Sequence, residues 1–95
     1  MRVEWSTPAA DEFEAAQNYY LSVNPIAARM LAQRVDAAIR MLRERPAAGR
    51  IGLHEGTREW VVQRSPYLLA YRVTDDALEI LHVWCAGQDW TNRAD

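Results

Sequence analysis

The sequence predicts an α+β domain in which a helical hairpin packs on one face of a small antiparallel sheet, in the order β-α-α-β-β-β. Three observations predict this fold. The length of 95 residues is typical of one domain, so we expect a single domain over residues 1–95. The first half repeats apolar residues at the helical period in two stretches. The second half alternates apolar and polar residues at the strand period in three stretches.

The N-terminal segment combines a short strand with the start of a helix. Val3 and Trp5 alternate with charged residues, and Ser6-Thr7-Pro8 then supplies a cap residue and a proline for the first helical turn. We therefore expect the first helix to begin near Pro8. Its core face is expected to carry the apolar residues that recur at i, i+4, i+7 and i+11, namely Ala9, Phe13, Ala16 and Tyr20.

The second helix repeats the same start signal at Asn24-Pro25. Its end is marked by Arg43, Arg45 and Pro46. Between these points a second apolar stripe recurs at the helical period, at Ala28, Leu31, Val35, Ala38, Ile39 and Leu42. Because only a few residues separate the two helices, they are expected to form a hairpin.

The remaining chain is expected to form an antiparallel meander. Residues 47–56 carry three glycines without periodicity, which predicts a loop. Strands are expected at residues 57–64, 67–73 and 78–85, separated by Ser65-Pro66 and by Thr74-Asp75-Asp76. Tyr67 and Tyr71 are expected to pack in the core with their hydroxyls bonded at its rim.

The last predicted strand is apolar on both of its sides. Strict alternation places Leu78, Ile80, His82 and Trp84 on one side, and Leu81, Val83 and Cys85 on the other. Two helices cover only one side of a sheet. The apolar second side therefore predicts that a partner chain or a docked tail covers it. The alternative is that the N-terminal strand and the C-terminal tail cover part of it.

Composition excludes several classes of function. The formal net charge of −2 argues against coating of nucleic acid through bulk positive charge. The chain has no lysine, which excludes a Schiff-base or lysine general-base mechanism. A lone Cys85 and the absence of a leader pattern favour the cytoplasm. No apolar run approaches the roughly 20 residues of a membrane span.

Several short segments occur in an order that is typical of one protein family. They are Trp5, Asn24-Pro25-x-Ala27-Ala28, Arg45-Pro46-x-x-Gly49-Arg50, Gly56-Thr57-Arg58-Glu59, Pro66-Tyr67-x-x-x-Tyr71-Arg72-Val73, and Glu79-Ile80-Leu81-x-Val83 followed by Ala86-Gly87-Gln88-x-Trp90. Over nearly its whole length the chain resembles the RelE/ParE toxins of type II toxin–antitoxin modules, in their ParE-like branch. The resemblance implies a β-α-α-β-β-β fold, toxicity, and neutralisation by a small cognate antitoxin in a hetero-oligomer.

The resemblance implies one of two targets. ParE-like toxins poison DNA gyrase without hydrolysing anything, whereas RelE-like toxins cut messenger RNA in the ribosome. RNA cleavage needs a base, an acid and cations, which RelE-like toxins supply with lysines, arginines and a late tyrosine or histidine. This chain lacks lysine, and Leu68 follows Tyr67 where RelE-like sequences tend to carry arginine.

We therefore expect a gyrase poison that has no catalytic residues, metal or cofactor. The alternative is a ribosome-dependent mRNA endonuclease that uses Arg64, Arg72 and His82. A third possibility is a non-toxic partner whose effect lies in its antitoxin complex and operator DNA. ParE-like chains commonly carry an arginine and a histidine near positions 82 and 85, and this chain departs from that pattern with His82 and Cys85.

Candidate residues for binding antitoxin or target combine arginines with large aromatic anchors. They are Arg58, Trp60, Arg64, Arg72, His82, Trp84 and Trp90. Arginine suits carboxylates and phosphates, and tryptophan is enriched among residues that dominate binding energy. Arg58 and Arg64 are expected to share a strand face with Trp60. The alternative for each arginine is a surface ion pair with a carboxylate such as Glu59 or Glu79.

Overall fold

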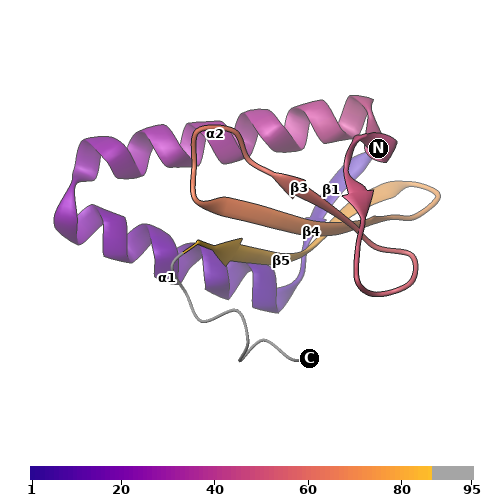
Figure 1. The fold of residues 1–95 in the computed structure, drawn as a ribbon, viewed down its shortest axis with the longest axis horizontal. Coiled ribbons are helices and arrows are strands. Elements are labelled where there is room, and N and C mark those ends of the chain that lie inside the picture. The colour runs from indigo at the N-terminus through magenta and orange to yellow at the C-terminus, as the bar shows by residue number, and fades with distance from the viewer. Residues whose placement is uncertain (87–95) are drawn as a thin grey trace.

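Two helices lie across one face of a five-stranded sheet in the computed structural model (Figure 1). The structure describes residues 1–86. In chain order the elements are β1 (Arg2–Trp5), α1 (Thr7–Val23), α2 (Pro25–Glu44), the 3-10 helix η1 (Pro46–Ala48), β2 (Arg50–Ile51), β3 (Arg58–Val61), β4 (Tyr67–Val73) and β5 (Ala77–Cys85). The predicted α+β class and element order are confirmed, and the short β2 is added within the segment expected to be a loop.

Both helices begin where the cap signals predict. The Ser6 Oγ accepts a hydrogen bond from the Ala9 backbone N–H at 3.0 Å. The Asn24 Oδ1 accepts one from the Ala27 N–H at 3.2 Å. A proline stands in the first turn of each helix, where a missing N–H costs nothing.

The core lies between the helical hairpin and the sheet. The two predicted helical stripes supply most of its helical side chains: Ala9, Val35, Ala38, Ile39 and Leu42 are buried in it, and Phe13, Ala16, Tyr20 and Leu31 pack against it. Tyr67 and Tyr71 are buried as predicted, and their hydroxyls find partners at the rim. Tyr67 donates to Gln17 Oε1 at 2.6 Å, and Tyr71 donates to the Pro46 carbonyl at 2.7 Å.

Gly49 allows the buried Tyr71 to reach the chain that follows α2. Its N–H donates to the Tyr71 hydroxyl at 2.9 Å. A Cβ at this position would lie 2.5 Å from that hydroxyl oxygen and 2.7 Å from the Glu59 carbonyl oxygen. The close approach of two backbone segments to one side chain therefore requires glycine here.

The sheet is mixed, with the strand order β1-β5-β4-β3-β2. β2 to β5 form an antiparallel meander, whereas β1 lies parallel to β5, from Arg2 opposite Ala77 to Trp5 opposite Ile80. The prediction of a purely antiparallel sheet was therefore wrong for β1. Alternation predicts a strand but not its direction, and the long chain between β1 and β5 permits a parallel pair.

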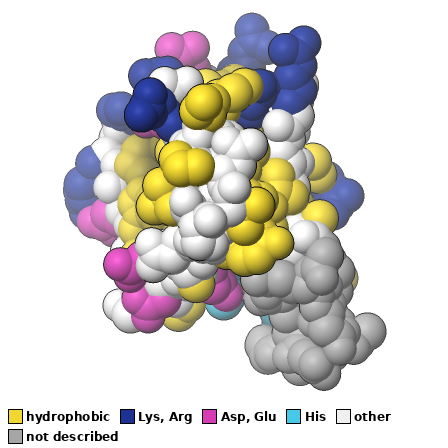
Figure 2. Space-filling view, turned by 90° about the vertical axis from the view of Figure 1, so that its left-hand side faces the viewer, with side chains coloured by type: hydrophobic (Ala, Val, Ile, Leu, Met, Phe, Trp, Pro, Cys, Tyr) yellow, Lys and Arg dark blue, Asp and Glu magenta, His cyan; other side chains and the backbone are white. Residues whose placement is uncertain are grey.

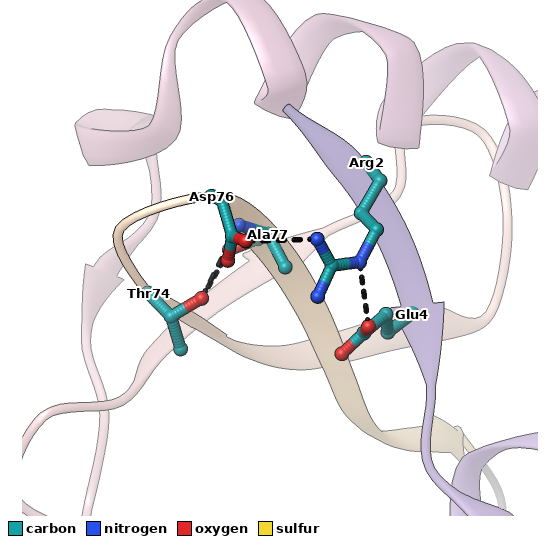
Figure 3. A network of polar contacts seen from close by, with 5 residues as sticks. All are labelled: Arg2, Glu4, Thr74, Asp76 and Ala77. Atoms are coloured by element: carbon teal, nitrogen blue, oxygen red, sulfur yellow. Dashed lines mark hydrogen bonds and ion pairs between the residues drawn. The ribbon is translucent and has the colours of Figure 1, made fainter.

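A polar network fixes the start of β1 against the turn between β4 and β5 (Figure 3). Arg2 contacts Glu4 at 2.7 Å through Nε and Asp76 at 2.9 Å through Nη1. The hydrogen bond from Arg2 lowers the pKa of the Asp76 carboxyl. All three side chains are exposed, so the network orients the strand edge more than it stabilises the fold.

A β-bulge at Leu81 reverses the alternation of β5. Ala70 lies opposite His82, but the next residue of β4, Tyr71, lies opposite Ile80, so Leu81 is inserted without a partner in the ladder. As a result the core receives Leu78 and Ile80 before the bulge and Val83 and Cys85 after it. The expected strict alternation was wrong, since His82 and Trp84 do not share a face with Leu78 and Ile80.

The corner between β1 and α1 supplies hydrogen-bond partners to the bulge. The Ser6 N–H donates to the Ile80 carbonyl at 2.9 Å, and the Ser6 hydroxyl donates to the Leu81 carbonyl at 2.8 Å. The Glu12 carboxylate accepts the Val83 N–H at 2.9 Å. Backbone groups displaced from the ladder are thereby satisfied, which stabilises the bulge in this position.

Candidate functional site

The sheet face that the helices leave uncovered carries a groove of about 320 Å³. The loop between β2 and β3 forms one wall, and the bulge of β5 forms the other. Much of the lining is apolar, and Leu53 at its border is 89% exposed. The lining residues are Ser6, Pro8, Leu53, His54, Thr57, Glu59, Ala70, Leu81, His82 and Trp84. This face therefore offers an apolar recess with two histidines.

His82 and Trp84 are brought together in this groove by the bulge. Their rings stack with centroids 5.2 Å apart and an interplanar angle of 19°. The Nδ1 of His82 lies 3.2 Å from the Glu12 carboxylate. A carboxylate only accepts hydrogen bonds, so Nδ1 carries the proton in this contact and Nε2 is the acceptor of the neutral ring. The groove thus presents an oriented imidazole beside an indole.

The arginines on this face are paired with carboxylates. Arg72 Nη2 lies 2.7 Å from Glu79, and Arg50 Nη2 lies 3.0 Å from Glu59. The side chains of Glu59 and Glu79 are only 11% and 24% exposed, so each pair holds its guanidinium against the sheet. The alternative prediction, a surface ion pair, is confirmed for Arg72. Little net positive charge remains there to attract a phosphate.

Three other candidates lie away from the groove. Arg58 and Trp60 share the side of β3 that faces the helices: Arg58 Nη1 donates to the Gly49 carbonyl at 2.8 Å, and Trp60 packs against the core. Arg64 lies beyond the end of β3, in the turn before β4, with a left-handed φ of 57°. With α2, Trp60 and Arg64 line a separate groove of about 330 Å³.

The expected common strand face of Arg58 and Arg64 was therefore wrong. Alternation continues through residue 64 in the sequence, but the chain leaves β3 after Val61 to make the turn around Ser65-Pro66. Trp90, the candidate nearest the C-terminus, lies outside the described residues.

The comparison with known families decides the identity of the chain. The model of the family described as "ParE toxin of type II toxin-antitoxin system, parDE" matches residues 3–90. The chain belongs to the ParE toxin family. It is similar to Y4kP of Sinorhizobium fredii (strain NBRC 101917 / NGR234), whose name gives it as a candidate toxin. The two are 36% identical over 89 residues, which cover 94% of this chain and 92% of the relative.

Solved structures share the fold of this ParE-family toxin. The chromosomal ParDE toxin–antitoxin system from P. aeruginosa matches with a TM-score of 0.78 and 24% identity, over 90% of this chain and 95% of that one. The YoeB/ParE toxin from Agrobacterium tumefaciens matches with a TM-score of 0.65 and 17% identity, over 90% and 98%. The E. coli DinJ-YafQ complex matches with a TM-score of 0.59 and 16% identity, over 90% and 93%.

Sequence reasoning missed two residues at the groove of this ParE toxin: His54, which lines it, and Glu12, which contacts His82 of its lining. Glu12 reaches His82 across 70 positions of the chain, so no local motif joins them. A signal was nevertheless present, because Glu12 stands three residues after Ala9 and four before Ala16, on the border of the core stripe. His54 lines the groove although its segment, residues 47–56, was predicted only as a loop.

Residues 1–86 of the toxin contain neither a candidate metal site nor a candidate membrane-spanning helix. Within residues 1–86 no group of three or more His, Cys, Asp and Glu side chains could hold a metal ion. None of the helices over the same residues is long and apolar enough to cross a membrane.

Proposed function

We propose that this ParE-family toxin arrests growth by binding and poisoning DNA gyrase, in the cytoplasm, and that a cognate antitoxin neutralises it in a hetero-oligomer. The observation that supports this target is the charge arrangement on the uncovered sheet face. Cleaving RNA requires cations at the crowded phosphate. Arg72 is paired with Glu79, and Arg64 lies in a turn that lines a different groove.

A poison that acts by binding needs a surface with an anchor rather than a set of catalytic groups. The groove supplies an apolar recess, and Trp84 in it is one of the residue types enriched among those that dominate binding energy. Two of the solved structures that share this fold belong to toxin–antitoxin pairs, ParDE and DinJ-YafQ. These pairs support an antitoxin as partner of this chain.

The second candidate function is ribosome-dependent cleavage of mRNA. One observation favours it: the contact between Glu12 and His82 orients an imidazole, and the His82 Nε2 forms no hydrogen bond with a described residue. An imidazole held in this way is suited to accept or donate a proton in general acid–base catalysis. In this account His82 would carry that role, with Arg64 and Arg72 as cations.

Alanine variants of His82 and Arg72 separate the two functions. If the toxin acts by binding gyrase with Trp84 as the anchor, His82→Ala and Arg72→Ala each leave growth arrest on induction largely intact, because neither removes the anchor; arrest is scored as the loss of colony-forming cells. The matched control is Arg40→Ala, which removes an exposed arginine paired with Asp36 on α2. Loss of growth arrest in variants that fold and still co-purify with antitoxin would instead support the endonuclease.

A further inference from the structure

An exposed apolar surface covers the tip of the helical hairpin, at the opposite end of the molecule from the N-terminus (Figure 1). We call it the tip patch and define it as Tyr19, Leu21, Val23, Ile26 and Met30. These side chains are 63%, 52%, 64%, 69% and 45% exposed. Because large apolar side chains gathered at one exposed site mark interaction surfaces, the tip patch calls for a partner.

The charges around the tip patch are arranged in two opposite groups. No charged residue occurs from residue 15 to residue 28. The charged residues of α1 are all acidic, and Glu14 is the last of them before the tip, whereas Arg29 is the first charged residue of α2 after it. Figure 2 looks onto this end: hydrophobic side chains gather there, basic ones predominate at the upper border, and acidic ones lie at the lower border.

Glu14 and Arg29 are both exposed, and neither forms an ion pair within residues 1–86. Helical spacing places each charge on a face that carries one member of the tip patch. Leu21 follows Glu14 by seven residues on one face of α1, and Ile26 precedes Arg29 by three on one face of α2. Each helix therefore presents an apolar side chain and a charge on one face, and the two charges are of opposite sign.

We propose that the tip patch is the contact surface of a symmetric homodimer of this chain. A two-fold axis makes every contact reciprocal, so where α1 of one copy lies on α2 of the other, α2 of the first also lies on α1 of the second. This arrangement buries Leu21 and Ile26 of one tip patch against the same residues of the other. It also brings Glu14 of each copy to Arg29 of the second copy, which yields two equivalent ion pairs, and neither charge beside the patch is left opposite a like charge.

Other occupants match this surface less well. A nucleic acid requires several cations at its contact, whereas the tip itself, residues 15–28, carries none and Arg29 is the first that follows. A partner of one dominant charge would oppose either Glu14 or Arg29. The small number of apolar side chains places the homodimer among weak associations, with a dissociation constant of roughly micromolar order.

Sedimentation equilibrium of the purified full chain over a wide concentration range tests the homodimer. We expect a monomer–dimer equilibrium that Ile26→Asp weakens by at least about tenfold, because the variant buries a charge in each patch. The matched control is Ile51→Asp, which makes the same change at a side chain that is 73% exposed in β2, away from the tip. It is expected to dimerise normally.

A charge exchange tests the pairing itself. Glu14→Arg and Arg29→Glu, taken singly, place like charges across the axis and are expected to weaken the dimer, whereas the double variant restores it. A chain that is monomeric at all concentrations overturns the proposal. So does a dimer that Ile26→Asp leaves intact, or a double variant that stays as weak as the single variants. None of these outcomes depends on the target of the toxin.

Discussion

At the scale of single residues, the two buried tyrosines show what a strand pattern can predict. Their spacing predicts that Tyr67 and Tyr71 point into the core, and the apolar rings make that placement favourable. The hydroxyls then require partners, because a buried unpaired polar group is costly. Those partners, Gln17 and Pro46, lie 50 and 25 positions away in the chain, so only the folded structure identifies them.

The Tyr71 hydroxyl is expected to stabilise the fold measurably. Tyr71→Phe leaves both the Pro46 carbonyl and the Gly49 N–H without a partner, which should lower the free energy of unfolding by about 1–3 kcal/mol. Urea denaturation measures the loss. Tyr19→Phe is the control, since this ring is 63% exposed, and an equal loss in both variants would contradict the role given to the Tyr71 hydroxyl.

The buried tyrosines also predict how stability depends on alkaline pH. Burial, with a smaller effect from the neighbouring Cys85, raises the pKa of Tyr20 to about 12, and burial also raises the pKa of Tyr67. In the unfolded chain a tyrosine ionises near pH 10. The unfolded state therefore loses its protons first, so the contribution of these tyrosines to stability is constant below about pH 10 and falls as the pH rises toward 12.

Urea denaturation at a series of pH values, with phenolate absorbance followed in parallel, measures this dependence. Tyr20→Phe should reduce the steepness of the fall above pH 10, whereas Tyr19→Phe should leave it nearly unchanged. The linkage is contradicted if stability is flat through that range, or if phenolate forms in the folded state as readily as in the unfolded state.

At the scale of the elements, caps and periodicity predict both helices and the strands of the meander. The bulge in β5 is different, because one inserted residue changes the phase of the alternation without any turn residue to mark it. The bulge exists because Ser6 and Glu12 supply the hydrogen bonds that the ladder loses. That compensation comes from α1 and its cap, more than 65 positions earlier in the chain.

Glu12 should therefore contribute to stability through the bulge. Glu12→Ala removes the acceptor of the Val83 N–H and is expected to lower the free energy of unfolding by about 1–3 kcal/mol. Asp11→Ala, at the neighbouring exposed position, should change it by less than about 0.5 kcal/mol. Comparable effects of the two variants would show that the carboxylate does not hold the bulge.

At the scale of the whole molecule, the sequence predicts the fold more completely than the site. Of the candidate residues within residues 1–86, only His82, Trp84 and Arg72 reach the uncovered sheet face, and Arg72 is held there by Glu79. Arg58 and Trp60 face the helices instead. The fold is predicted better than the site because a strand residue can be assigned to one face of the sheet only when two things are known. These are the phase of the alternation, which the bulge in β5 changes, and the residue at which the strand ends.

The proposed action of this ParE-family toxin on gyrase is tested by a plasmid supercoiling assay with purified gyrase, ATP and the antitoxin-free chain. We expect loss of supercoiling, accumulation of cleaved DNA, and reversal of both when antitoxin is added. Undiminished supercoiling at a several-fold molar excess of folded toxin would exclude gyrase as the target, and mRNA cleavage in ribosomes with His82 as the acid–base group would then take its place.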